Sequence, residues 1–297
     1  MRDMIQMETD SVVVEILPRI GGAVAAFDLK RGGERVPIFR RWNGESDNPR
    51  AFGSNPMVPW FNRISGGGID FGGTFYAIAP NDPLEPVPLH GDGWHSPWNV
   101  VDQKPHKLIL KLRSQAIPPF DYEATQIISL RDATLELDLA VKHLGEKPIP
   151  YGLGHHPWFV RTPGVTLQAR AAGIWLEQPP AFPTSSTPAS PIPQKWDFAT
   201  PRLLPEEFVD NGFAGWDGRA RIDWTDRGVT VDVEADPSTH FYHVYSLGKD
   251  CPIFCFEPVT HQNNAYCKPG GAEANALRVL KTGESTSMWA RFTAAPR

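Results

Sequence analysis

The fold class follows first from one alternating stretch, LELDLAV at residues 135–141. Leu or Val stands at every second position, and Glu136, Asp138 and Ala140 separate them. Successive side chains of an extended chain point to opposite faces, so this spacing predicts a strand with one face on an apolar core and the other toward solvent. Residues 108–112 and 229–233 show the same kind of pattern and predict two further strands.

Less regular strands are expected where short apolar runs stand between turn residues. They are expected at 12–16, 23–29, 124–129, 165–169, 241–246, 253–257 and 287–292. A helical bundle is excluded, because 30 of the 297 residues are Pro and one Pro inside a helix costs about 3 kcal/mol. Strands without intervening helices pair antiparallel. The sequence therefore predicts an all-β fold, a large antiparallel β-sandwich.

We expect the whole chain, residues 1–297, to form a single domain. Its most Pro-rich segment, residues 179–205, holds eight Pro residues and allows two interpretations. It is either a linker between two domains or an ordered excursion within one. Similar strand patterns on both sides favour the excursion, with Trp196 and Phe198 as anchors on the core.

Composition and charge exclude several classes of protein. The net charge is −5 and no basic stripe is present, so we expect no nucleic-acid partner. No apolar run approaches 18 residues, so no membrane span is expected. The first ten residues lack the apolar centre of a secretory signal, and the three cysteines are an odd number. Both features predict reduced thiols and a cytoplasmic location.

Aromatic and polar residues gather in four turn-rich segments, at 55–64, 89–95, 154–159 and 254–258. Loops on a rigid scaffold are where binding residues usually stand. Aromatic faces cover the C–H patches of a sugar ring, and charged groups bind its hydroxyls. The combination favours a sugar site, with Trp60, Trp94, Trp98 and Trp158 as expected stacking faces.

Two residues in these segments are candidates for acid–base work. Glu257 follows the apolar run 253–256 directly, and desolvation at the end of a buried strand would raise its pKa and suit a general base. The alternative is a Glu that simply reaches solvent. His156 has the side chain most used for proton transfer, but a His beside aromatics is also a common core residue. His155 and His156 point to opposite faces of an extended chain, so at most one faces a cleft.

Metal and cofactor sites are not expected. Cys251 and Cys255 resemble a zinc knuckle, but the residues between them have the pattern of a strand. His90 and His95 have no carboxylate at a recognisable ligand spacing.

Taken in order, the motifs resemble those of the aldose 1-epimerase family, also called galactose mutarotases. They are ILPRIGG (16–22), the Asn62-Arg63-Ile64 signature within 55–64, LHG (89–91), HPWF (156–159), FEP (256–258) and LKTGES (280–285). The resemblance implies a galactose mutarotase-like supersandwich with a sugar cleft across one sheet. It also implies that the α and β anomers of a free aldose interconvert by ring opening and reclosure, without a cofactor. Its implied partner is a small sugar, and its implied state is a monomer or homodimer.

Carried over by position, the resemblance assigns roles to individual residues. Glu257 would take the proton from the anomeric O1 hydroxyl, and His156 would protonate the ring O5. His90 would hydrogen-bond near the anomeric centre, and Arg63 would bind ring hydroxyls with Asn62 beside it. The sugar-binding Asp of the family matches Asp210 within VDNGF (209–213), with Asp217 as the competing match. Trp158 stands where the family usually has Tyr.

Three alternatives stay open. The first keeps the fold but takes an anionic sugar, such as a hexose 6-phosphate or a sulfonated or uronic sugar. It would need a second arginine beside Arg63, either Arg50 or Arg161. The second is a sugar-binding or regulatory module without activity, since fold alone does not give function. The third is a glycosidase, which needs a second carboxylate beside Glu257.

Overall fold

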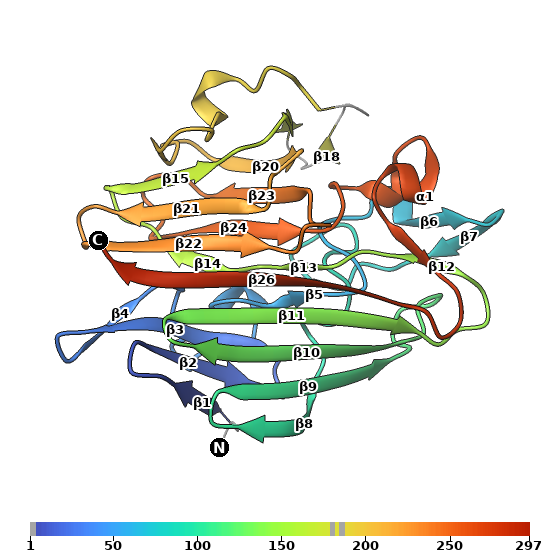
Figure 1. Ribbon diagram of the computed structural model, residues 1–297. Coiled ribbons are helices and arrows are strands. Elements are labelled where there is room, and N and C mark those ends of the chain that lie inside the picture. Colours follow the sequence, from blue (N-terminus) through green and yellow to red (C-terminus); the bar gives the residue numbers. More distant parts are fainter. Residues whose placement is uncertain (1–3, 179–181, 184–187) are drawn as a thin grey trace.

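Two large antiparallel sheets dominate the molecule, as a computed structural model describing residues 4–178, 182–183 and 188–297 shows (Figure 1). The larger sheet has nine strands and runs in Figure 1 from β15 near the top to β8 at the bottom. In spatial order its strands are β19 (Arg202–Leu203), β15 (Val165–Ala169), β21 (Arg219–Trp224), β22 (Val229–Ala235), β26 (Ser285–Pro296), β11 (Thr134–His143), β10 (Tyr122–Arg131), β9 (Lys107–Ser114) and β8 (Asn99–Lys104).

The second large sheet has seven strands and carries most of the candidate site. In spatial order they are β16 (Gly173–Trp175), β20 (Val209–Ala214), β23 (Phe241–Ser246), β24 (Ile253–Val259), β13 (Gly154–His155) and β5 (Pro56–Met57), and β14 (Trp158–Val160) also pairs with β24.

Smaller sheets complete the scaffold. A four-stranded sheet consists of β1 (Ile5–Glu8), β2 (Val12–Leu17), β3 (Ala23–Arg31) and β4 (Glu34–Pro37). Two-stranded pairs are β6 (Gly68–Phe71) with β7 (Thr74–Ala77), β12 (Ile149–Tyr151) with β25 (Arg278–Leu280), and β17 (Glu177–Gln178) with β18 (Phe182–Pro183).

Alternating side chains bring the two large sheets together over one core. Leu135, Leu137 and Leu139 of β11 are buried on the inner face, as the alternation predicted. From the opposite sheet, the Phe159 ring lies 6.0 Å from the Phe292 ring of β26, between centroids. The predicted all-β, antiparallel fold class is therefore confirmed, and every strand predicted from the sequence is present.

Helix is confined to single turns in the described part of the chain. They are η1 (Pro49–Ala51), η2 (Ser65–Gly67), η3 (Gln194–Trp196), η4 (Ala265–Cys267) and the four-residue α1 (Gly271–Ala274). Across the ranges that the structure describes, no helix is long and apolar enough to cross a membrane.

The Pro-rich segment packs onto the sandwich wherever the structure describes it. Phe198 is fully buried and its ring lies 5.9 Å from that of Phe213. Trp196 packs against the same core, and β19 pairs with β15. Both predicted anchors are thus in place. Residues 179–181 and 184–187 of the segment lie outside the described residues.

One carboxyl group on the outer face of the nine-stranded sheet stands in an apolar setting. Asp138 of β11 lies between Ile127 of β10 and Trp289 of β26 in the strand register. Burial, followed by the negative charge of Glu136, raises the pKa of Asp138 to about 6.

This setting predicts that Asp138→Asn stabilises the protein in a pH-dependent way. The folded state keeps the Asp138 proton up to about pH 6, whereas the unfolded state loses it near pH 4. Wild-type stability at this site therefore falls as pH rises between these values. After allowance for solvent screening, the variant should gain about 1 kcal/mol in unfolding free energy at pH 8. Urea unfolding at pH 8 and pH 3.5 measures the difference, which should vanish at the lower pH. Asp250→Asn, at a highly exposed carboxylate, is the control, and an equal gain at both pH values would contradict the explanation.

Candidate functional site

Three neighbouring strands position the polar floor of the site. In β20, β23 and β24 the alternate residues that face the core are apolar, namely Val209, Phe213, Tyr242, Val244, Phe254 and Phe256. The residues between them therefore share the opposite face of the sheet. The register places His243 directly opposite Glu257 and Tyr245 opposite Cys255. Asp210, on β20, reaches the same surface, since β20 pairs with β23.

The side chains on this face line a cleft of about 340 Å³. All six residues predicted for the site are among its lining residues. The lining consists of Arg50, Asn62, Arg63, Leu89, His90, His156, Trp158, Asp210, His243, Tyr245 and Glu257. The structure therefore brings together residues that are more than 190 positions apart in the chain.

Glu257 and His156 form a buried pair at the floor of the cleft. Their nearest atoms, His156 Nε2 and Glu257 Oε1, are 3.5 Å apart. Glu257 Oε2 and His156 Nδ1 are buried and have no hydrogen-bond partner among the described residues. The prediction that Glu257 ends its strand is wrong, because β24 continues through Pro258 to Val259. Glu257 is consequently only 2% exposed, more deeply buried than a strand end would be.

Burial acts on the two groups in opposite directions. It raises the pKa of Glu257 well above its usual value, and the charge of Asp210 adds to the rise. It lowers the pKa of His156 to about 3, with Arg50 and His243 contributing. Both shifts oppose charge, so burial favours the tautomer in which Glu257 holds a proton and His156 is neutral. One proton and one empty proton-accepting position are thus available at the cleft floor.

His90 and Asn62 hold each other in unusual backbone conformations. Both have positive φ, 55° for His90 and 61° for Asn62. The Asn62 backbone N–H donates to His90 Nδ1 at 3.0 Å, and the His90 N–H donates to the Asn62 carbonyl at 3.1 Å. Nδ1 is therefore an acceptor, which leaves the single proton of the neutral ring on Nε2. Burial and the nearby His156 keep the pKa of His90 well below its usual value, so this ring serves as a neutral donor.

Gly91 makes this turn possible. It has a φ of +70°, and a Cβ atom built on it would lie 2.2 Å from the Val58 carbonyl oxygen. No other residue combines that conformation with so close an approach of two backbone segments.

Charged groups at the cleft compensate one another. Arg63 binds both oxygens of Glu85, at 2.7 and 2.9 Å, and lies 3.5 Å from Asp210 Oδ2. Arg50 binds Asp82 at 3.1 Å and Glu85 at 3.0 Å. Each guanidinium group thus has two carboxylate partners, and the rigid fork geometry fixes their positions.

Asp210 differs from Glu257 although both lie on one face. Burial alone would raise the pKa of Asp210, but the hydrogen bond with His243, 2.6 Å from Oδ1, and the charges of His243 and Arg63 outweigh it and keep the pKa below its ordinary value. Asp210 is therefore an ionised acceptor facing a protonated or protonatable Glu257. This answers the choice between Asp210 and Asp217 by position, since Asp210 lines the cleft.

Sequence reasoning missed His243, Tyr245 and Glu85. His243 was within reach, because its strand was predicted and Tyr242 and Val244 mark the buried face. What was missing was the register that sets His243 beside Glu257. Glu85 stands in a turn-rich stretch without periodicity, so no pattern indicates it.

Several expected neighbours of the cleft lie elsewhere. Trp60 and Trp98 are fully buried in the core, and Trp94 packs edge-on against His90 from behind the lining. Only Trp158 of the four expected stacking faces lines the cleft, and it stacks on His156 with 5.1 Å between ring centroids. Arg161 donates to Ser246 and to the Pro205 carbonyl, so Arg50 is the second arginine of the site.

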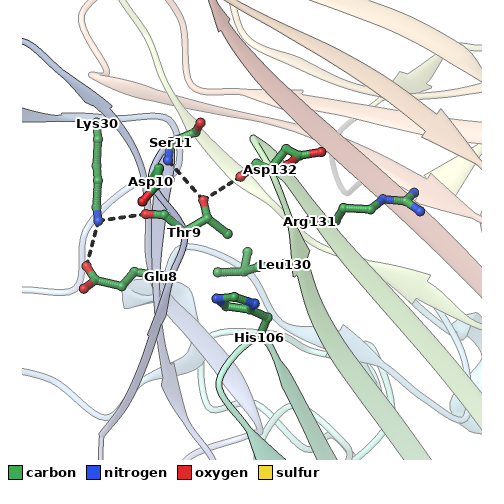
Figure 2. Close-up of a pocket in the computed structure, with 9 residues that line it drawn as sticks. All are labelled: Glu8, Thr9, Asp10, Ser11, Lys30, His106, Leu130, Arg131 and Asp132. Carbon is green, nitrogen blue, oxygen red and sulfur yellow. Dashed lines mark hydrogen bonds and ion pairs between the residues drawn. The ribbon is translucent and has the colours of Figure 1, made fainter.

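A larger hollow, of about 1000 Å³, lacks these features (Figure 2). It lies among hairpin ends, where Lys30 bridges the Glu8 carboxylate and the Thr9 carbonyl. His106 and Glu8 are exposed there. Without a buried acid–base pair, this hollow is a surface depression and not the candidate site.

Fold and cleft together define a β-sandwich protein with a buried proton-transfer pair beneath a small polar cleft. The sequence model of the aldose 1-epimerase family matches residues 3–293. The chain belongs to the aldose 1-epimerase family.

Individual relatives agree with this membership. The Escherichia coli K12 protein YphB, whose function is uncharacterized, is 33% identical over 238 residues, which are 78% of this chain and 80% of that protein. The crystal structure of a proposed aldose 1-epimerase from E. coli K12 superposes with a TM-score of 0.89 at 28% identity, covering 99% of both chains. A galactose mutarotase-like protein from Clostridium acetobutylicum shares the fold, with a TM-score of 0.84 at 18% identity over 99% of this chain and 95% of its own.

The burial of His156 predicts that its imidazole stays neutral through the physiological range. A free histidine is half protonated near pH 6.5, whereas the pKa of His156 is about 3. Imidazole NMR of labelled protein, with the signals assigned by their loss in His156→Gln, should show no titration of His156 between pH 8 and pH 5. The exposed ring of His106 is the reference within the same sample. A midpoint near 6.5 for His156 would show that burial does not control this group.

Proposed function

We propose that this protein is an active aldose 1-epimerase that interconverts the α and β anomers of a neutral free aldose. The single observation that carries the proposal is the buried Glu257–His156 pair, with 3.5 Å between Nε2 and Oε1, beneath the cleft of a family member. A protein that only binds sugar has no use for such a pair, because burying two titratable groups without full hydrogen bonding costs stability.

The chemistry needs one proton removed and one delivered. Ring opening breaks the C1–O5 bond while the C1–O1 bond becomes a carbonyl, so O1 loses a proton and O5 gains one. Glu257 takes the O1 proton and His156 gives its proton to O5. Reclosure on the other face of C1 reverses both transfers, and the protein returns to its starting state. Each group is expected to contribute about 10²–10⁴-fold to the rate.

The sugar itself would prepare the pair for this step. The O1 hydroxyl can donate to Glu257 Oε2, which has no partner among the described residues. A hydrogen bond to a carboxylate favours its charged form. Binding would therefore shift the shared proton from Glu257 to His156, which turns the neutral tautomer into a carboxylate and an imidazolium.

The surrounding residues supply orientation. Neutral His90 presents Nε2–H as a donor near the anomeric centre, and the ionised Asp210 accepts from ring hydroxyls. Arg63 and Asn62 bind further hydroxyls, and Trp158 offers an aromatic face. All of these line the cleft, and the ion pairs of Arg63 hold it in place before substrate arrives.

Charge compensation favours a neutral sugar over an anionic one. Both guanidinium groups of the cleft already bind the carboxylates of Asp82, Glu85 or Asp210. A phosphate or sulfonate would meet more negative than positive charge at this surface, and like charges repel over such distances.

Replacing either member of the pair should abolish most of the turnover and leave sugar binding in place. We expect Glu257→Gln and His156→Gln to lower kcat by at least about 100-fold, with KM changed much less, as measured by polarimetry on freshly dissolved α-anomers. Glu8→Gln and His106→Gln, in the larger hollow, are matched controls with the same substitutions. Wild-type turnover in either cleft variant would contradict the mechanism, and binding without turnover in the wild-type protein would favour a silent sugar-binding module.

A substrate panel tests the neutral-sugar assignment. We expect kcat/KM for glucose or galactose to exceed that for glucose 6-phosphate and glucuronate by about tenfold or more, because one unfavourable charge contact costs about 1.4 kcal/mol or more at this depth. NMR exchange between the anomers gives both constants under one condition. A faster rate on the anionic sugars would instead implicate Arg40, whose guanidinium carbon lies 5.7 Å from the centre of the Trp158 ring.

A further inference from the structure

Cys255 is the one titratable group on the cleft face of β24 that the proposed reaction does not use. It stands two residues before Glu257, so the two side chains share a face. Its strand neighbours are Trp158 on β14 and Tyr245 on β23. The rings of these two neighbours lie 5.7 Å apart between centroids, and Cys255 is fully buried.

The thiol completes a cluster of three ligand types. One ring nitrogen of His156, Cys255 Sγ and a carboxylate oxygen of Glu257 all lie within 4.8 Å of one another. Zinc bonds of about 2.0–2.3 Å to N, O and S place tetrahedral ligands about 3.3–3.7 Å apart. The 3.5 Å between His156 Nε2 and Glu257 Oε1 already meets this spacing. Closing the remaining pairs needs side-chain shifts of about 1 Å.

Two features distinguish this cluster from a chance grouping of polar side chains. His156 is 8% exposed, Glu257 2% and Cys255 0%. Glu257 Oε2 and His156 Nδ1 also have no hydrogen-bond partner among the residues described. Buried lone pairs without a donor are costly, and a cation would satisfy them.

We propose that His156, Cys255 and Glu257 form a binding site for a thiophilic divalent cation, of the Zn²⁺ and Cd²⁺ class, which inhibits the epimerase reaction. Thiolate and carboxylate together neutralise the two positive charges, and imidazole is the third ligand. Sulfur and nitrogen donors select against Mg²⁺ and Ca²⁺, which require oxygen ligands. The fourth position faces the cleft and would hold water. This ion is an inhibitor, and the proposed reaction proceeds without it.

Inhibition follows from the lone pairs that the ion would occupy. As the metal–sulfur bond forms, Cys255 loses its thiol proton to solvent. The same ion takes the electron pairs of His156 and Glu257 that the sugar needs for proton transfer. Metal and sugar therefore compete. The inhibitory part rests on the proposed function, whereas binding of the ion does not.

The test measures binding and inhibition separately. Binding is followed by titrating Cd²⁺ into the wild-type protein and recording the ultraviolet charge-transfer absorption of the cadmium–thiolate bond. Inhibition is followed by polarimetry with Zn²⁺, reversed by a chelator and repeated at rising sugar concentration. The variants are Cys255→Ala and Cys255→Ser. The matched control is the double variant Cys251→Ala/Cys267→Ala, which leaves Cys255 as the sole thiol, since the chain has three cysteines.

We expect the double control to keep the cadmium–thiolate absorption and the Zn²⁺ inhibition of the wild-type protein. Both Cys255 variants should keep basal turnover, lose the absorption at stoichiometric Cd²⁺, and need at least about tenfold more Zn²⁺ for half inhibition, since even an outer partner of a metal ligand is worth that much. Loss of the absorption in the double control, or equal inhibition of the Cys255 variants and wild type, would overturn the proposal. Absorption without turnover on any sugar would refute the proposed function and leave the metal site standing.

Discussion

The two-residue period of β20, β23 and β24 is the constraint on which both halves of this protein depend. One parity of residues, including Phe213, Val244 and Phe256, enters the core. The other parity cannot enter it without burying charge against apolar side chains, and so it faces the cleft. Core and candidate site are therefore two sides of the same strands, and neither can shift register without exchanging a phenylalanine for a carboxylate.

Two carboxyl groups on that face have opposite electrostatic settings. Asp210 has His243 and Arg63 as partners, which outweigh the effect of its burial. Glu257 has no comparable donor, so burial dominates and raises its pKa. Neighbouring groups pushed apart in this way are typical of sites where one acid binds and another transfers protons. The difference arises from the strand register, because it decides which carboxyl group lies within reach of the His243 ring.

Much of the fold could be predicted from the sequence, since alternation and the abundance of Pro are local properties. Glu257 and His156 were recognisable as candidates from their own surroundings, whereas Arg63, Asn62 and Asp210 needed the family resemblance. His243 and Glu85 could not be found in either way. Each owes its place to a pairing between distant segments: the Glu85 carboxylate matters because Arg50 and Arg63 converge on it, and no short stretch of sequence records that convergence. The strand end predicted at Glu257 failed for a similar reason, since the pairing of β24 with β23 continues past Pro258.

Gly212 shows how far the setting of this cleft depends on an atom that is missing from the chain. A Cβ there would lie 2.8 Å from Asn263 Oδ1, and Asn263 donates to His243 Nδ1 at 3.1 Å. That amide keeps the proton of the His243 ring on Nε2, where it is donated to Asp210. A single methyl group at position 212 would displace Asn263, release the ring to its other tautomer and remove the donor that keeps Asp210 ionised. The acidity of a cleft carboxylate is thus set two residues away, by bare backbone on the neighbouring strand.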